Sequence, residues 1–301
     1  MEQRVLKENE LVLIGDYLGD IPRTRRHLGL YYKDTRYLSM FELYLSGYKP
    51  RHMASSCRQD CVCDIQLANP TIESRDGVTV MARSIGIVRS RFLTDGLHER
   101  ITLYNYNSFP VSTDITLCLG TDFADIFEVR GYERDKRGEI SKPSFSGSRL
   151  TFEYSGLDSK ILTTEIIFDA PPSSVEIDEQ SQIIKERSST FLPESIEIIS
   201  STMIRPPYAK VTWNVTIEPR EPFSMVLHIH PVEAESTVET VHFEKGLTLA
   251  CERFQRWHDR CTKIETDNEL FNRLVERSIF DLRLLLERTP EGYIVAGGIP
   301  W

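Results

Sequence analysis

The chain lacks any apolar run of the roughly 20 residues that a membrane-spanning helix requires. Its first residues, MEQRVLKENELVLIG, also lack the apolar core of a secretory signal peptide. Together these absences predict a cytoplasmic protein without a membrane partner. A composition of 40% apolar and 27% charged residues over 301 positions is that of an ordinary globular protein, with room for one large domain or two smaller ones.

An excess of positive charge is also missing. The formal net charge is -9, whereas a nucleic-acid-binding protein needs a surplus of lysine and arginine to neutralise phosphates. We therefore expect no nucleic-acid partner. Two local arginine clusters have acidic residues nearby, and we interpret them as solvated faces: Arg23, Arg25 and Arg26, and Arg83, Arg89 and Arg91.

Cysteine is scarce, and without a signal peptide the 6 cysteines are not expected to form a disulfide framework. Cys57, Cys61 and Cys63 lie close together, but no second pair at zinc spacing accompanies them, so reduced thiols on a strand are favoured over a metal site. His228 and His230 would share one face of a strand. Since no third ligand lies nearby in sequence, we expect neither a metal nor a cofactor.

Short segments of alternating apolar and polar residues dominate the chain up to residue 235. Glycine, proline and aspartate separate them, which is the pattern of strands joined by turns. The expected strands cover residues 11–14, 36–45, 79–92, 101–106, 111–119, 150–154, 161–168, 195–201, 210–217 and 223–229. Because no helical segment separates them, we predict a mainly β fold in which antiparallel sheets form a large β-sandwich.

Aromatic residues make up 10% of the chain, and most have a packing explanation. Trp213 shares its predicted strand face with Val211 and Val215, so a core position is favoured over a sugar-stacking platform. Five tyrosines are denser than chance: Tyr31, Tyr32, Tyr37, Tyr44 and Tyr48. Their rings would suit a sugar-binding groove, but sheet packing uses the same residues and is favoured.

Helical spacing replaces strand alternation after about residue 237. Residues 243–259 carry Leu247, Phe254 and Trp257 on one side. We interpret this segment as a linker helix that leaves the sandwich and packs at its edge. The expected divisions are a sandwich domain over residues 1–235, a helical linker over 236–265 and a further helical region over 266–301.

A second helix is expected over residues 267–286, and its apolar stripe is the strongest in the chain: Leu270, Phe271, Leu274, Val275, Ile279, Leu282, Leu285 and Leu286. Thr266 is the expected N-cap, with Glu269 at the capping-box position. Pro290 and Gly292 should end the helix before a loop of small residues. Almost nothing that follows can cover such a stripe. We therefore expect the front part of a larger protein, and association of the isolated chain through this stripe.

Four stretches carry a family resemblance when they are taken together. They are Gly19-Asp20-Ile21 with GLYYKDTRYLS from Gly29, DFADIFEVRG from Asp122, the helix over 267–286, and Gly298-Ile299-Pro300-Trp301. In this order they resemble the N-terminal region of bacterial and archaeal amylo-α-1,6-glucosidase (glycogen debranching enzyme)-like proteins. Each stretch is short, but their combination is specific and spans the whole chain.

The resemblance implies a supersandwich-like domain joined by a helical linker to an (α/α)6 toroid with a glycosidase active site. The helix over 267–286 would be the first of the toroid, and the family's Gly-Arg-Asp motif and catalytic carboxylates would follow Trp301. At about 11 residues per helix, the other helices would occupy well over 100 further residues. The parent enzyme would act on a glycogen-like α-glucan, whereas this chain alone is expected to be inactive.

One acidic segment is the densest candidate for chemistry. It contains Asp122, Asp125 and Glu128, followed by Arg130, Arg134 and Arg137. Glycoside hydrolysis needs two carboxyl groups roughly 5–10 Å apart, one of them with a raised pKa. Ion pairs that pin a loop are nevertheless the favoured interpretation, because such pairs readily mimic sites. A loop that reaches toward the toroid's pocket is the functional alternative.

Three more residues are candidates for a role beside the toroid. Asp34 and Arg36 lie two positions apart on a predicted strand, so their side chains would point the same way and pair with each other or across strands. A positioning role at the interface with the toroid is the alternative. Trp301 follows a glycine-rich loop fixed by Pro300, which suits a ring that flanks a sugar, and its place in the family motif implies substrate binding.

Two functional hypotheses follow. In the first, the chain is the leading portion of an α-glucan hydrolase that cleaves α-1,6 branches, and its sandwich stabilises the catalytic toroid. In the second, the chain is a stand-alone β-sandwich that binds a glucan or a partner protein without chemistry. Continuation of the reading frame past Trp301 into a helix-rich region with a Gly-Arg-Asp motif would distinguish them.

Overall fold

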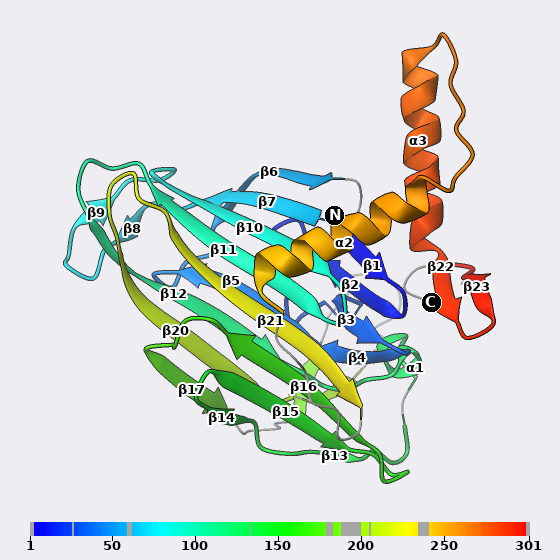
Figure 1. Ribbon diagram of the computed structural model, residues 1–301. Helices are drawn as coiled ribbons and strands as arrows, with labels where there is room; N and C mark the ends of the chain where they lie inside the picture. The colour runs from blue at the N-terminus through cyan, green and yellow to red at the C-terminus, as the bar shows by residue number, and fades with distance from the viewer. Residues whose placement is uncertain are drawn as a thin grey trace, which may run out of the picture.

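Antiparallel strands make up most of the protein, so the predicted mainly β fold is confirmed (Figure 1). The computed structural model describes residues 3–25, 27–58, 62–132, 134–178, 183–187, 200–204, 206–233 and 241–298. Every strand pair among the named strands in these ranges is antiparallel, as expected for strands joined by turns rather than by crossover helices.

A nine-stranded and a four-stranded sheet form the sandwich. The larger sheet runs β13 (Glu139–Ile140), β15 (Arg149–Ser155), β16 (Ile161–Phe168), β21 (Phe223–Glu233), β11 (Leu97–Asn105), β10 (Ile85–Leu93), β7 (Val62–Ala68) and β6 (Arg51–Arg58), with β14 (Ser144–Ser146) also paired to β15. The smaller sheet runs β17 (Ser174–Asp178), β20 (Tyr208–Ile217), β12 (Val111–Gly120) and β5 (Met40–Leu45).

The hydrophobic core lies between these two sheets. Phe168 of β16 meets Trp213 of β20 edge-on, with ring centroids 5.1 Å apart. Trp213 is 3% exposed and donates its indole N–H to the Ala170 carbonyl at 3.0 Å. The predicted core position of Trp213 is therefore confirmed. Tyr31 and Tyr37 are buried as well, as sheet packing requires.

Smaller sheets complete the β structure. The third sheet has four strands: β1 (Arg4–Glu8), β2 (Leu11–Gly15), β3 (Gly29–Tyr32) and β4 (Thr35–Leu38). Two-stranded pairs are β8 (Ile72–Glu73) with β9 (Thr79–Val80), β18 (Ile183–Arg187) with β19 (Ser200–Ile204), and β22 (Leu286–Thr289) with β23 (Gly292–Val295). Most expected strands have counterparts here. The strands that were not predicted are β1, β3, β6, β7, β8, β13, β14, β17, β18, β22 and β23.

Two expected strands are each divided in the structure. The segment 36–45 breaks at Ser39, because β4 belongs to the third sheet and β5 to the sandwich. The segment 79–92 breaks after β9, where Arg83 adopts a positive φ of 64° and Asn69 accepts the N–H of Ile85 at 2.8 Å. The expected strand over 195–201 lies mostly outside the described residues, which resume with β19 at Ser200.

Arg89 and Arg91 correct another expectation, since both are fully buried rather than solvated. They lie on the inward face of β10 and share the carboxylate of Glu99 on β11, at 2.6 Å and 2.5 Å. Arg89 also donates to Asp20 at 2.5 Å, and Arg91 donates to the Gly19 carbonyl at 2.7 Å. These bonds tie the Gly19-Asp20 turn, part of the family resemblance, to the sandwich core.

Within the described residues, the helices that accompany the sheets are α1 (Ile126–Val129), α2 (Phe243–His258) and α3 (Glu269–Leu284). α2 lies across the outer face of the nine-stranded sheet (Figure 1). Phe243 packs against Phe92 of β10 at a centroid distance of 5.0 Å and clusters with Val226 of β21. Both strands are central, so the expected position at the sandwich edge is wrong. Among the described residues, no helix is both long and apolar enough to cross a membrane.

α3 projects from the body of the protein (Figure 1). Its N-cap is Asn268, whose side chain accepts the N–H of Phe271 at 3.1 Å. The predicted Thr266 cap is wrong because Thr266 bonds the Asn272 side chain instead. None of the 16 residues of α3 is buried. β22 and β23 follow as a hairpin where a loop was expected.

Candidate functional site

Most of the predicted site residues meet around α1. The turn between β3 and β4 places Lys33 and Asp34 at positive φ, 44° and 63°. The carbonyl of Asp34 accepts the N–H of Ile126 at 3.0 Å, while Arg36 donates its backbone N–H to the Ala124 carbonyl at 2.8 Å. The hairpin therefore holds the start of α1 through backbone hydrogen bonds.

Asp34 does not pair with Arg36, which corrects the expectation of two side chains on one strand face. Asp34 lies in the turn with its side chain exposed, whereas Arg36 is buried. The Arg36 guanidinium instead clasps the Asp122 carboxylate through two bonds, with Nε 3.1 Å from Oδ1 and Nη2 on Oδ2. A Cβ at Gly29 would come within 2.6 Å of the Arg36 side chain, so glycine leaves room for this arginine.

The buried pair changes the protonation behaviour of its surroundings. Burial by itself lowers the pKa of Arg36, but the Asp122 carboxylate outweighs it, and the net direction is upward. Burial also raises the pKa of Tyr31 to about 12. Arg36 therefore remains charged at neutral pH, and Tyr31 remains a neutral phenol.

Asp125 and Glu128 cap α1 reciprocally. Asp125 accepts the N–H of Glu128 at 2.8 Å, and Glu128 accepts the N–H of Asp125 at 3.1 Å. Arg134 pairs with both carboxylates, and Arg137 lies 3.0 Å from Glu128 and bonds the Asp122 carbonyl. Burial raises the pKa of Glu128, and Arg137 opposes the shift. We call Arg36, Asp122, Asp125, Glu128, Arg134 and Arg137 the α1 cluster.

In the α1 cluster each carboxylate already has an arginine partner, so the geometry is that of a clamp. Arg130 is exposed and forms the C-cap of α1. The clamped segment presents two exposed rings, Phe127 and Tyr132, with centroids 6.0 Å apart and planes at 84°. Exposed aromatic residues on a rigid loop suit a contact surface. Trp301 lies outside the described residues.

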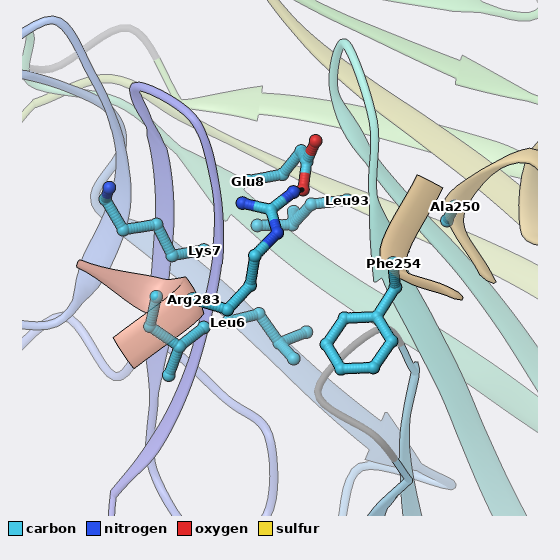
Figure 2. A pocket seen from close by; sticks show the side chains of 8 residues that line it. Leu6, Lys7, Glu8, Leu93, Ala250, Phe254 and Arg283 are labelled. Carbon is cyan, nitrogen blue, oxygen red and sulfur yellow. Dashed lines mark hydrogen bonds and ion pairs between the residues drawn. The ribbon is translucent and has the colours of Figure 1, made fainter. Parts of the chain in front are cut away.

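A second assembly joins the first strand to the last helix. Arg283 of α3 donates to the Glu8 carboxylate at 3.0 Å, and Lys7 lies 3.3 Å from the carboxylate of Glu287. Asn9 accepts the N–H of Arg288 at 2.7 Å. Figure 2 shows Arg283 directed toward Glu8 across a small cavity. At about 20 Å³ this cavity has room for a single water and not for a sugar.

Phe280 strengthens this junction from the α3 side. Its ring lies 5.0 Å from that of Phe254 on α2 and 5.5 Å from that of His258. Burial lowers the pKa of Lys7, while Glu287 opposes that shift. The C-terminal half of α3 is therefore fixed to both β1 and α2, although the apolar stripe remains largely uncovered.

His228 and His230 share one strand face, as predicted, and gain a partner that sequence distance concealed. His98 of β11 lies opposite His228, and their Nδ1 atoms are 2.6 Å apart. The sequence could have indicated the face on which His98 lies through the alternation of β11, where His98 and Arg100 occupy the face opposite Ile101. The residues described here contain no group of three side chains arranged to hold a metal. Cys63 is disulfide-bonded, which corrects the expectation of a reduced thiol there.

Comparison with protein families gives a match over most of the chain. A sequence model described as the N-terminal domain of some glycogen debranching enzymes matches residues 6–228. No curated protein matches the chain.

Several solved structures match much of the chain at low identity and with TM-scores below 0.5. A putative kojibiose phosphorylase from the human microbiome has a TM-score of 0.41 and 8% identity, with 82% of this chain covering 28% of that one. A putative aldose 1-epimerase from Escherichia coli K12 has a TM-score of 0.41 and 9% identity, and the match covers 77% of this chain and 99% of that one. A galactose mutarotase related enzyme from Lactobacillus acidophilus has a TM-score of 0.40 and 9% identity, and the match covers 80% of this chain and 100% of that one.

Proposed function

The chain belongs to the family of N-terminal domains of glycogen debranching enzymes, and from this membership we propose that it is the N-terminal portion of an amylo-α-1,6-glucosidase-like glycoside hydrolase acting on glycogen-like α-glucans. In this proposal residues 1–235 form the supporting sandwich, residues 236–265 the linker, and residues 266–301 the beginning of the helical catalytic domain. The protein is expected in the cytoplasm, without a cofactor.

The single observation that carries this proposal is the exposure of the apolar stripe of α3. Leu270, Leu274 and Leu282 are 78%, 62% and 57% exposed, although the C-terminal end of the helix is anchored by Arg283 and Phe280. A helix with a fixed base and an uncovered apolar stripe is suited to pack against further helices. The family's helical domain would supply that cover.

The α1 cluster then has a positioning role in the same proposal. Its ion pairs hold the loop that carries the exposed rings of Phe127 and Tyr132. The adjoining turn also holds this loop, because the Asp34 carbonyl accepts the N–H of Ile126. We assign Asp34, Arg36, Asp122, Asp125, Glu128 and Arg130 to holding this loop at the interface with the helical domain. Trp301 is assigned to the wall of the sugar site. Because each carboxylate of the cluster is paired with arginine, hydrolysis would be performed outside this chain.

A substitution on the stripe tests the proposal. Leu274→Asp should leave the unfolding midpoint of the 301-residue chain unchanged, because the side chain is already solvated. In the longer protein the same change should lower the melting temperature and the release of glucose from limit dextrin. Glu276→Ala, at another exposed position of α3, is the matched control and should change neither. Equal behaviour of both variants in the longer protein would contradict the role of α3.

The alternative is a stand-alone sandwich module that binds a glucan or a partner protein without catalysis. A reading frame that ends with Trp301 would favour this alternative and remove the first proposal for this gene product. A frame that continues into a helix-rich region with a Gly-Arg-Asp motif would favour the hydrolase.

A further inference from the structure

An open pocket of about 700 Å³ lies on the outer face of the nine-stranded sheet, beside the start of α2. Its volume falls within the roughly 300–1,000 Å³ that ligand pockets occupy. Val226 and Phe243 contribute apolar lining, while Arg100, Asp169, Ser224 and His228 contribute polar groups. In Figure 1, α2 begins over β21 and β11 and ends beside α3, so the pocket lies at the end of α2 remote from the junction with α3.

His228 is a polar residue of this pocket whose ring makes one hydrogen bond within the described part of the chain. The side chain is 4% exposed, and its Nδ1 is occupied by His98. Nε2, the other ring nitrogen, makes no hydrogen bond within the described part of the chain. Because His228 lines the pocket, this nitrogen is available to bond a ligand that enters it.

The surrounding hydrogen bonds determine which nitrogen of His228 carries the proton. Thr94 donates its hydroxyl to Asp95 at 2.6 Å, so the hydroxyl oxygen accepts from Nε2–H of His98 at 2.7 Å. In a neutral imidazole that carries its proton on Nε2, Nδ1 of His98 bears the lone pair. His228 must donate its Nδ1–H to that lone pair. Its Nε2 therefore presents a lone pair to the pocket and is a hydrogen-bond acceptor.

Aromatic rings extend the pocket along the same sheet face. Tyr104 lines the pocket at 37% exposure, and its ring is parallel to that of Tyr106, with 8° between the planes and 6.5 Å between centroids. Tyr106 lies over Gly86, where a Cβ would meet the ring at 3.0 Å. Two parallel exposed rings beside polar groups are the arrangement that packs against the apolar faces of sugar rings.

The charges of the pocket disfavour an anionic ligand. Arg100 is paired with Glu244 of α2 at 2.5 Å, which leaves no surplus cation for a phosphate or carboxylate. One oxygen of Asp169 accepts the N–H of Val226 at 2.7 Å, and the residue is exposed, so its other oxygen can accept a hydroxyl. Ser224 and Thr102 share one hydrogen bond at 2.9 Å. A ligand with many hydroxyl groups matches this set of acceptors and donors.

We propose that the pocket binds a neutral oligosaccharide, with Nε2 of His228 accepting a hydrogen bond from a sugar hydroxyl and the ring of Tyr104 packing on a sugar face. The identification of that sugar as an α-glucan rests on the proposed function. α2 has 16 residues and is therefore about 24 Å long, so a glucan held here would be bound well away from the helical domain. The site would tether the polymer.

Isothermal titration of the 301-residue chain with maltoheptaose tests the proposal, with cellohexaose as the comparison sugar. Binding of maltoheptaose is expected. Tyr104→Ala should weaken it by about tenfold, the order expected for an aromatic contact. Ser224→Trp should abolish it, because the larger side chain fills the pocket from an exposed position. Tyr17→Ala is the matched control, since Tyr17 is 38% exposed at a turn elsewhere, and it should bind as the unmodified chain does.

The ¹⁵N imidazole spectrum of His228 provides a second readout that does not depend on stability. Nε2 should show the shift of an unprotonated nitrogen, and that shift should move when maltoheptaose is added. Absence of heat with both sugars would overturn the pocket while leaving the hydrolase proposal standing. Binding that persists in Tyr104→Ala and Ser224→Trp would also overturn it. Binding of cellohexaose alone, lost in both variants, would support the pocket and contradict the α-glucan function.

Discussion

Replacing Glu99 with glutamine should strongly destabilise the fold. Glu99 is fully buried and is the one carboxylate bonded to both Arg89 and Arg91 in the described part of the core. Glutamine retains the shape and one acceptor oxygen, but it removes the charge and turns an amide N–H₂ toward a guanidinium. The substitution therefore leaves buried positive charge without its counter-ion.

The size of this destabilisation depends on which partners each arginine keeps after the substitution. Arg89 keeps its ion pair with the Asp20 carboxylate at 2.5 Å, so it loses only one of its two carboxylate partners. Arg91 keeps only the Gly19 carbonyl, and burial already lowers the pKa of Arg91 to about 10, so this guanidinium is poorly stabilised without Glu99. Removing one partner of a buried ion pair costs about 3–5 kcal/mol. We expect the free energy of unfolding to fall by about 3 kcal/mol or more.

Urea-induced unfolding followed by tryptophan fluorescence measures this change, with Trp213 as a core reporter. The control is Glu269→Gln, which breaks an exposed pair with Arg273 on α3 and should shift the midpoint by no more than an exposed ion pair does. If Glu99→Gln unfolds at the same urea concentration as the control, the buried network does not stabilise the sandwich and the reasoning is refuted.

The remaining predictions concern three other regions. Asp122→Asn should speed proteolysis at the segment 122–137 while Asp158→Asn, at an exposed turn, leaves the rate unchanged; equal rates would contradict the clamp. Burial lowers the pKa of His228 to about 4, so the unfolded chain binds more protons between pH 6.5 and 4. His228 should contribute up to about 3 kcal/mol to the fall in the free energy of unfolding as the pH drops through that window. The slope should become shallower in His228→Phe without disappearing, because burial lowers the pKa of His230 to about 4 as well. Leu270→Lys should reduce self-association in size-exclusion chromatography, whereas a monomeric parent chain would contradict association through α3.

Alternation in the sequence was sufficient to predict the sandwich, because each strand has one face in the core. Residues 111–119 and 161–168 correspond closely to β12 and β16. The same alternation placed Arg89 and Arg91 on the face of Ile85 and Ile87, yet arginine was expected outside because it is rarely buried. Only the long-range encounter with Glu99 and Asp20 makes that burial possible.

The ion pairs of Asp122, Asp125 and Glu128 with arginines agree with the interpretation from the sequence, but the individual roles of the residues around them were not all foreseen. Asp125 and Glu128 sit at capping-box spacing, a local signal that the sequence carries. The turn at Lys33 and Asp34 lacks the glycine that usually marks a two-residue hairpin, so it was taken for part of a strand. The pairing of Arg36 with Asp122 spans 86 positions and depends on how the third sheet meets α1.

The outer pocket was hidden for the same reason. His98 and His228 are 130 positions apart, and their contact follows from the register between β11 and β21. Sequence spacing registers neighbours along one strand, such as His228 and His230, and misses partners that a sheet brings together. The position of α2 over the central strands completed the pocket, whereas periodicity predicted only the helix.

Glucose release from limit dextrin by the purified 301-residue chain is the most direct test of the proposed function. The proposal holds that the chain supports a catalytic domain that lies elsewhere and that the carboxylates of its α1 cluster are held in ion pairs. It predicts no glucose above the buffer blank at any pH at which the chain remains folded. Measurable turnover by the pure chain, removed by Glu128→Gln, would contradict it and place the active site in the α1 cluster.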